Sequence, residues 1–282
     1  MRLAAKSVIL ELLSAAGSRP GPARLLVAAC SLFGISENST RVTLARLLAD
    51  GTLETTARGT YRLGAGTQEL TRQVTSWRTL EAEAIRWDGA WVCAFTAELP
   101  RSDRAALRRR GRALRLLGFR ELARGLWVRP DNLRGGVASV SSRLASLGLD
   151  PAAPIFEARF DPAFDLRARS LWDGRALASS YRTTQKRLER WLASERSRDR
   201  DTAARESFLL GREALKQVLF DPLLPDALVD VAARRAFFAT ARRFDEVGRR
   251  IWARRFGVDR SLMDAPDAAF ASALRHRPEA VH

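Results

Sequence analysis

The sequence predicts an α+β protein in three parts, and three observations lead to this class. Apolar residues recur at helical spacing through residues 3–49. Between residues 87 and 163, β-prone runs alternate with helical patterns, and beyond residue 164 only helical periodicity remains. With 282 residues, 46% of them hydrophobic, the chain can bury the cores of two or three domains.

Three helices are predicted at the N-terminus, because glycine and proline interrupt the apolar pattern twice. They cover residues 3–16, 22–34 and 37–49. Gly34 suits the left-handed position that follows a helix, and Ser36 is a good N-cap for the third helix.

Two short β-prone segments, 52–56 and 60–63, follow the third helix and flank a turn at Arg58. Their spacing predicts a hairpin. Three helices followed by a hairpin form a winged helix-turn-helix, which we assign to residues 1–66. Apolar residues at helical spacing then predict a linker helix over residues 67–86, suited to a spacer or a dimer element.

The middle of the chain predicts a ferredoxin-like domain over residues 87–163. The expected order is strand, helix, strand, strand, helix and strand, the βαββαβ pattern of that fold. These elements are expected at residues 91–99, 101–117, 119–124, 126–129, 132–147 and 155–160. Residues 164–282 carry only helical patterns and are expected to form a helical C-terminal domain.

The charge of the chain points to a polyanionic partner. The formal net charge is +16 and the sequence pI is about 11.3, which favours nucleic acid. Only three of the 48 basic residues are lysines, however, and a GC-rich genome produces such an arginine excess without selection for function. Charge alone therefore does not establish DNA binding.

Cysteine usage and hydropathy predict a soluble cytoplasmic protein. Cys30 and Cys93 each lie in an apolar run, where a buried free thiol is expected rather than a disulfide or a metal pair. No stretch approaches the roughly 18 apolar residues of a membrane span, so no membrane partner is expected.

The third helix separates an apolar face from a small, polar and basic one. Thr40, Leu44 and Leu47 share the apolar face. On the other side, Arg can pair with guanine edges, Asn with adenine, and small methyl groups with thymine. The predicted DNA-binding residues, which include the N-cap and the hairpin tip, are Ser36, Asn38, Ser39, Arg41, Val42, Ala45, Arg46, Arg58 and Thr60. An ordinary helix bundle with solvated arginines is the alternative.

Three separated motifs together resemble the PaaX family of transcriptional repressors. They are the helix-wing sequence from Asn38 to Gly51, the central segments 87–91 and 125–130, and the C-terminal segments 171–173 and 220–225. The resemblance implies a homodimeric repressor of aromatic-acid catabolic genes that an aryl acyl-CoA thioester, such as phenylacetyl-CoA, releases from operator DNA. Two departures concern the operator sequence: the wing is short and weakly basic, and Thr40 stands where the family usually has an aliphatic residue.

Two other functions compete with this one. Glu98 and Asp103 suggest, as an alternative, a metal-dependent nucleic-acid hydrolase that uses the central domain. A nonspecific DNA-binding protein is a further alternative. The favoured interpretation is a regulator that is not an enzyme and has no catalytic residues, metal site or cofactor, while the effector-binding residues are unassigned.

One basic cluster has two interpretations. Its members, on the predicted helix 101–117, are Arg104, Arg108, Arg109, Arg110, Arg112 and Arg115. They could bind the phosphates of coenzyme A, because a guanidinium group pairs well with phosphate. A solvated helix face is the commoner explanation of such a run. Tryptophans 87, 91, 127 and 172 could likewise line an acyl pocket or simply pack.

Overall fold

The computed structural model describes residues 3–15, 20–64, 76–100 and 102–257, which fall into two compact units. Unit 1 contains the chain up to residue 76, residues 195–209 and the chain from residue 245. Unit 2 contains residues 77–194 and 210–244. The C-terminal helices are thus divided between the two units, and each unit is described by itself.

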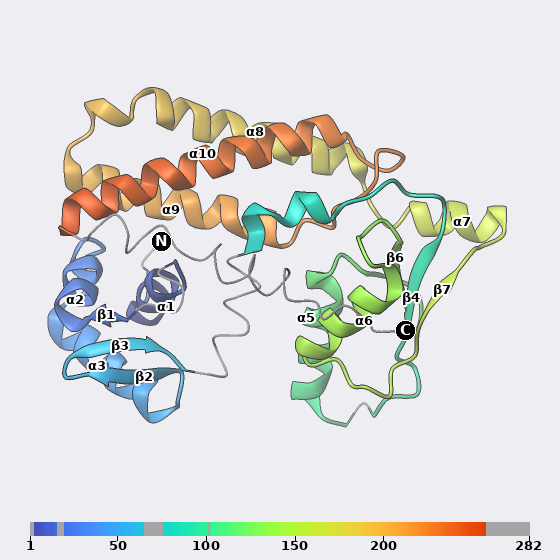
Figure 1. Ribbon diagram of the computed structural model, residues 1–282, viewed down its shortest axis with the longest axis horizontal. Coiled ribbons are helices and arrows are strands. Elements are labelled where there is room, and N and C mark those ends of the chain that lie inside the picture. The colour runs from blue at the N-terminus through green and yellow to red at the C-terminus, as the bar shows by residue number, and fades with distance from the viewer. Residues whose placement is uncertain (1–2, 16–19, 65–75, 101, 258–282) are drawn as a thin grey trace, which may run out of the picture. The chain divides into compact units, whose positions relative to one another are not determined.

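The N-terminal part of unit 1 is a winged helix (Figure 1). Helices α1 (Ala5–Ala15), α2 (Ala23–Ser31) and α3 (Glu37–Ala49) are accompanied by strands β1 (Gly21–Pro22), β2 (Leu53–Ala57) and β3 (Thr60–Leu63). The strands form an antiparallel sheet in the order β1-β3-β2. The hairpin β2-β3 follows α3 directly, as the sequence predicts.

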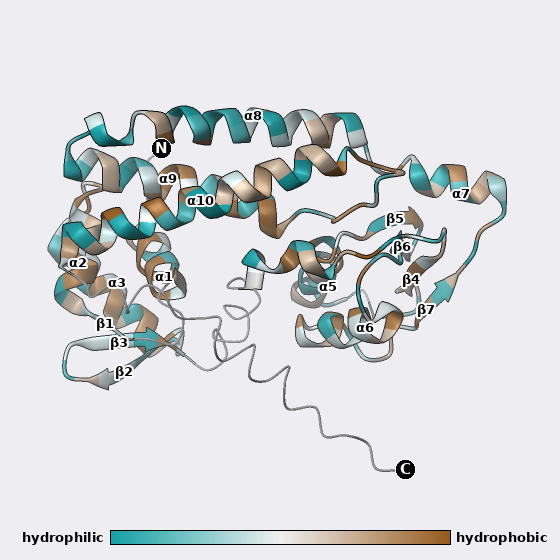
Figure 2. Cartoon of the chain, turned by 45° about the horizontal axis from the view of Figure 1, so that its top comes forward, coloured by the Kyte–Doolittle hydropathy of each residue, from teal (hydrophilic) through white to brown (hydrophobic). Residues whose placement is uncertain are grey.

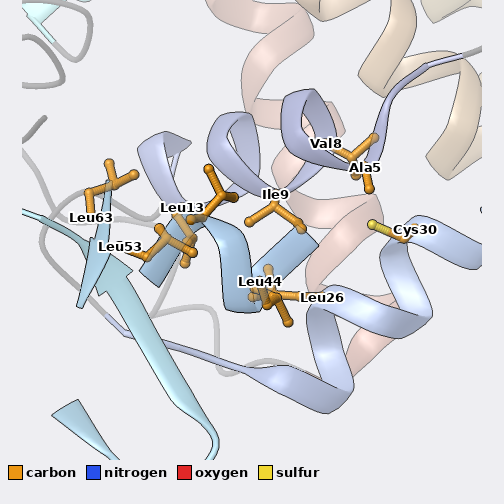
Figure 3. Packing of buried hydrophobic residues seen from close by; sticks show 10 residues of the cluster. Ala5, Val8, Ile9, Leu13, Leu26, Cys30, Leu44, Leu53 and Leu63 are labelled. Carbon is orange, nitrogen blue, oxygen red and sulfur yellow. The ribbon is translucent and has the colours of Figure 1, made fainter. Parts of the chain in front are cut away.

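Aliphatic side chains from all three helices and from the hairpin meet in one core (Figure 3). Ile9 of α1, Leu26 of α2, Leu44 of α3 and Leu53 of β2 are each no more than 2% exposed. Cys30 joins the same core as a buried free thiol, and burial raises its pKa. Removing apolar surface from water is the main stabilising contribution here.

The winged helix also packs on the parts of the C-terminal helices that belong to unit 1. The ring of Phe33 lies 5.1 Å from that of Phe208, which lies 5.6 Å from that of Trp252. The indole N–H of Trp252 donates to the carbonyl of Ala204 at 3.0 Å. Residues from opposite ends of the sequence therefore form one compact body.

Unit 2 contains the expected ferredoxin-like sheet. Strands β4 (Trp91–Phe95), β5 (Arg120–Ala123), β6 (Leu126–Pro130) and β7 (Ile155–Ala158) pair antiparallel in the order β5-β6-β4-β7. Helices α5 (Arg104–Leu116) and α6 (Gly136–Ser146) lie on one side of this sheet (Figure 1). In β4, four consecutive residues are buried, as expected for a central strand.

The remaining helices are α7 (Pro162–Arg169), α8 (Gly174–Ala193), α9 (Arg200–Leu219) and α10 (Val231–Phe256). A short 3-10 helix, Glu195–Ser197, precedes α9. Hydrophilic and hydrophobic residues alternate along α8, α9 and α10 (Figure 2), which suits helices that bury one side. Within unit 2, Tyr181 stacks on Phe237 with ring centroids 5.9 Å apart, and Trp191 lies 4.9 Å from Phe244.

The segment 220–225 is held by buried polar contacts. The carboxylate of Asp221 accepts hydrogen bonds from the Tyr181 hydroxyl and, at 2.8 Å, from the amide of Leu223. Burial raises the pKa of Asp221. Leu223 has φ +50°, a left-handed conformation that non-glycine residues rarely adopt, and these bonds fix it.

The same segment is tied to the ferredoxin-like part. The side-chain amide of Asn132 donates to the carbonyl of Leu223 at 2.7 Å and accepts from the buried guanidinium of Arg129 at 3.1 Å. Gly118, at φ +78°, lies so close that an added Cβ would stand 2.8 Å from Cα of Pro222. The C-terminal motif at 220–225 is therefore an internal brace of unit 2.

The predicted linker helix over 67–86 is wrong in the part that the structure describes. Two short 3-10 helices, Ser76–Arg78 and Leu80–Glu83, take its place. Ala84 then forms an isolated antiparallel bridge with Leu133, in the segment before α6. This pairing requires an extended backbone at Ala84, so a helix cannot continue there. Residues 65–75 and 258–282 lie outside the described residues.

The predicted α+β class, with its winged helix, ferredoxin-like and helical parts, is confirmed. So is the burial of both thiols: Cys30 and Cys93 are free and 0% exposed. Within the described ranges, no helix combines the length and the apolar character that crossing a membrane requires.

Candidate nucleic-acid interface

Helix α3 begins and ends where its sequence dictates. The hydroxyl oxygen of Ser36 accepts a hydrogen bond from the amide of Ser39 at 3.2 Å and so caps the helix. Past its end, Gly51 has φ +70°, and Asp50 accepts from the amide of Thr52 at 3.0 Å. Hydrogen bonds from the side chain and the backbone of Thr52 lower the pKa of Asp50.

The buried face of α3 fixes how the helix is turned. Thr40, Leu44 and Leu47 are each at most 2% exposed and recur at helical spacing. The Thr40 hydroxyl donates to the carbonyl of Ser36 at 3.0 Å, so this polar group is satisfied within the core. With this face packed, the opposite face of the helix points to solvent.

The solvent face of α3 carries most of the predicted DNA-binding residues. Asn38, Ser39, Arg41, Val42, Ala45 and Arg46 are all exposed, and so is the cap Ser36. Val42 is 43% exposed, so its methyl groups are accessible to a partner. Amide, guanidinium and methyl groups thus lie on one accessible surface, which matches what base edges in a major groove offer.

Arg41 has a partner that was not predicted from the sequence. Its Nε and Nη2 approach Oε1 of Glu37 at 2.7 and 2.6 Å, one helical turn away. Both side chains are more than half exposed, at 63% and 59%. The spacing of four residues between an acidic and a basic side chain was the available signal. Glu37 therefore belongs to the candidate interface.

The wing is short but firmly held. Gly59, at φ +71°, closes the hairpin, and its carbonyl accepts from the amide of Ala23 at 2.8 Å. Arg58 at the tip is exposed, whereas Thr60 is half-buried because β3 is the middle strand of its sheet. Among the predicted residues, Thr60 is the one least accessible to a partner.

The two acidic residues considered for a hydrolase, Glu98 and Asp103, have different surroundings. The carboxylate of Asp103 caps α5 by accepting from the amides of Ala105 and Ala106 at 2.7 and 3.1 Å. These bonds lower the pKa of Asp103. Glu98 is exposed in the turn after β4. Throughout the described ranges, no group of three or more His, Cys, Asp or Glu residues is placed to hold a metal ion.

The tryptophans of unit 2 mostly pack. Trp91 is fully buried, its indole N–H donates to Asp165 at 2.9 Å, and Trp172 stacks on it at 5.9 Å. Trp87 contacts the edge of Trp91 and carries the guanidinium of Arg169 on its face, 4.7 Å from the ring centre. Trp127 is half-buried.

An open pocket of about 590 Å³ lies at the start of α8. Trp172, Arg175, Arg182, Leu228 and Asp230 are among its lining residues. Arg182 pairs with Asp230, while Arg175 is exposed at the rim. The pocket therefore combines guanidinium groups with aliphatic residues and the edge of one largely buried aromatic side chain, Trp172.

Comparisons with known proteins agree with this architecture. A family model described as PaaX-like protein matches residues 4–66, one described as PaaX protein central Cas2-like domain matches 84–168, and one described as PaaX-like protein C-terminal domain matches 172–254. No curated protein matches the chain.

A solved structure has the same fold. It is the uncharacterized protein Rv0674 from Mycobacterium tuberculosis, with a TM-score of 0.55 and 24% sequence identity over 88% of this chain and 98% of that one. The three family models follow one another in chain order and together cover most of the sequence. The chain therefore belongs to the PaaX-like proteins, a family of transcriptional regulators.

Proposed function

We propose that the protein is a cytoplasmic, dimeric transcriptional repressor that reads operator DNA with α3 and is released by an acyl-CoA thioester. The observation that carries the DNA-binding part is the solvent face of α3, where Asn38, Arg41, Val42 and Arg46 stand exposed opposite the buried Thr40 and Leu44. Such a face can enter a major groove and contact base edges directly.

In this proposal two arginines make the main base contacts. Arg41 and Arg46 can each pair bidentately with guanine, and Asn38 can pair with adenine. Arg58 at the wing tip reaches the phosphate backbone or the minor groove. In a dimer, two copies of α3 enter successive major grooves, about one helical turn apart along a pseudo-palindromic site.

Single substitutions on α3 test this assignment. We expect Arg41→Ala and Arg46→Ala each to weaken binding to DNA from the region upstream of the gene by roughly 1–3 kcal/mol, because each loses a base contact. Arg190→Ala, an equally charged change at an exposed position of α8, is the control and should bind like wild type. Thermal unfolding checks that all variants are folded. Unchanged binding by both α3 variants contradicts the assignment.

For the effector we propose the pocket at the start of α8. Its volume of about 590 Å³ lies within the range of small-molecule sites, and its lining places apolar residues such as Leu228 beside the cation of Arg175. A ligand releases the DNA only if it binds the DNA-incompetent arrangement more tightly.

Phenylacetyl-CoA is the test ligand for this pocket. It should lower the affinity of the wild-type protein for its operator, and Arg175→Ala should raise the concentration required while leaving binding in its absence unchanged. If the thioester saturates the protein without changing operator affinity, the effector part of the proposal is wrong and the DNA-binding part stands.

A further inference from the structure

Four arginines form a stripe along the exposed side of α5, in the ferredoxin-like part of unit 2. They are Arg104, Arg108, Arg112 and Arg115, hereafter the α5 stripe. Their spacings of four, four and three residues place them on one face of the helix. All four are exposed. At a rise of 1.5 Å per residue, the stripe is about 16 Å long.

The other two arginines of the cluster have different surroundings. Arg110 is only 8% exposed, lies among the buried residues of α5 and donates to the carbonyl of Pro100 at 3.2 Å. Arg109 is exposed and lies 3.9 Å from a carboxylate oxygen of Asp103. The basic run of the sequence therefore divides into one buried arginine, one beside an acidic group and the α5 stripe.

Within the described ranges, the α5 stripe stands apart from the acidic side chains. In the part of the chain that the structure describes, no carboxylate forms an ion pair with any of its four arginines. Other exposed arginines of unit 2 are paired, such as Arg187 with Glu213 and Arg182 with Asp230. Arg115 instead lies near another cation, Arg120. Burial lowers the pKa of Arg120, and the charge of Arg115 lowers it further.

Such a stripe is unfavourable for the helix itself. Like charges three and four residues apart repel each other, and here they do so three times in succession. A polyanion would remove this repulsion. The arrangement narrows the choice of ligand: the four arginines follow one line along the helix, and α5 contains no aromatic residue on which a base could stack. A linear array of phosphates fits better than a compact nucleotide, which needs a concave site.

We propose that the α5 stripe binds the phosphate backbone of DNA outside the base pairs that α3 reads. The proposal rests on the proposed function, since both require DNA as partner. Guanidinium groups on a smooth helix face contact phosphates without reading sequence, so the stripe adds affinity and salt dependence but no selectivity.

A fourfold substitution in the full-length protein tests the proposal. The variant R104Q/R108Q/R112Q/R115Q is compared with R187Q/R190Q/R235Q/R243Q, which removes the same charge from exposed positions of α8 and α10. The slope of log K against log salt concentration is measured for each protein on upstream DNA and on a scrambled duplex.

The α5 variant should bind both duplexes more weakly, by roughly tenfold or more, with their affinity ratio kept. Its slope should fall by about 0.9 for each phosphate that is no longer neutralised, whereas the control should keep the wild-type slope. Equal slopes in both fourfold variants overturn the α5 proposal. If the wild-type protein still prefers upstream DNA, the proposed function is unaffected by that result. Absence of selectivity in wild type instead contradicts the proposed function.

Two further measurements keep the test decisive. The half variants R104Q/R108Q and R112Q/R115Q should each show about half of the change in slope, and they serve if the fourfold variant does not fold, as judged by circular dichroism. Coenzyme A is titrated as a separate probe. Loss of coenzyme A binding in the α5 variant, with DNA binding unchanged, overturns the proposal.

Discussion

At the scale of single residues, the candidate interface depends on a pairing that lies on the helix surface. Glu37 holds the guanidinium of Arg41 through one carboxylate oxygen, Oε1. The carboxylate thereby orients the arginine, and it also places a negative charge where phosphates would approach. Glu37 should therefore favour selectivity over raw affinity.

Glu37→Gln tests this role, because it removes the charge and keeps the size of the side chain. We expect tighter binding to scrambled DNA and a ratio of upstream to scrambled affinity that falls up to about tenfold, since Arg41 loses its orientation. Titrations of both duplexes measure the ratio. A ratio equal to that of wild type shows that the ion pair has no part in selection.

The two thiols allow a second prediction at this scale. Burial raises the pKa of Cys30, and that of Cys93 to about 11, so the folded protein disfavours both thiolates. The folded pKa of each thiol lies above the unfolded value, so the unfolded state ionises first as pH rises. The free energy of unfolding should therefore fall as pH rises toward 11. At pH 8 both thiols should resist a disulfide reagent in the native protein and react once urea unfolds it. Rapid labelling of the native protein contradicts the burial.

At the scale of elements, much was predictable because the signals are local. The bounds of α3, residues 37 to 49, follow from Ser36 before it and Gly51 after it. The exposure of most predicted site residues was also predictable, because the 3.6-residue period of the helix places them on the face opposite the buried Leu44. Strand β1 was missed, since two residues, Gly21 and Pro22, carry no periodic pattern.

Contacts between distant segments gave no signal in the sequence. Asn132 and Leu223 are 91 residues apart, yet they share a hydrogen bond that braces unit 2. The linker helix failed for a related reason: helical spacing over 67–86 does not reveal that Ala84 pairs with Leu133. The same holds for the α5 stripe, because only the structure separates Arg110 from its exposed neighbours.

The packing of Gly118 against Pro222 can be tested with two glycines that have similar positive φ angles. Gly118 and Gly148 have φ of +78° and +84°, so both substitutions to alanine carry the cost of a left-handed backbone. At Gly118 the new Cβ would also stand 2.8 Å from Cα of Pro222, whereas nothing lies within 4 Å at Gly148. Urea unfolding should show Gly118→Ala to be less stable than Gly148→Ala by roughly 1–3 kcal/mol. Equal losses would falsify the close packing.

At the scale of the whole molecule, the basic residues that give the net charge of +16 differ in their surroundings. Several arginines of the helical part pair with carboxylates of neighbouring helices, whereas the arginines of α3 and of the α5 stripe are exposed, and Arg41 pairs within its own helix. We therefore assign selectivity to one helix of unit 1 and sequence-independent affinity to one helix of unit 2. Net charge alone would have suggested only the sequence-independent affinity.

Sequence-selective DNA binding by α3 is best tested by titrating the wild-type protein with duplex DNA from the region upstream of its gene and with a scrambled duplex of equal length, at near-physiological salt. We expect binding to the upstream duplex at least roughly a thousandfold tighter than to the scrambled one, within the range of specific regulators. Equal affinity for the two duplexes would contradict this function, because the solvent face of α3 would then read no sequence.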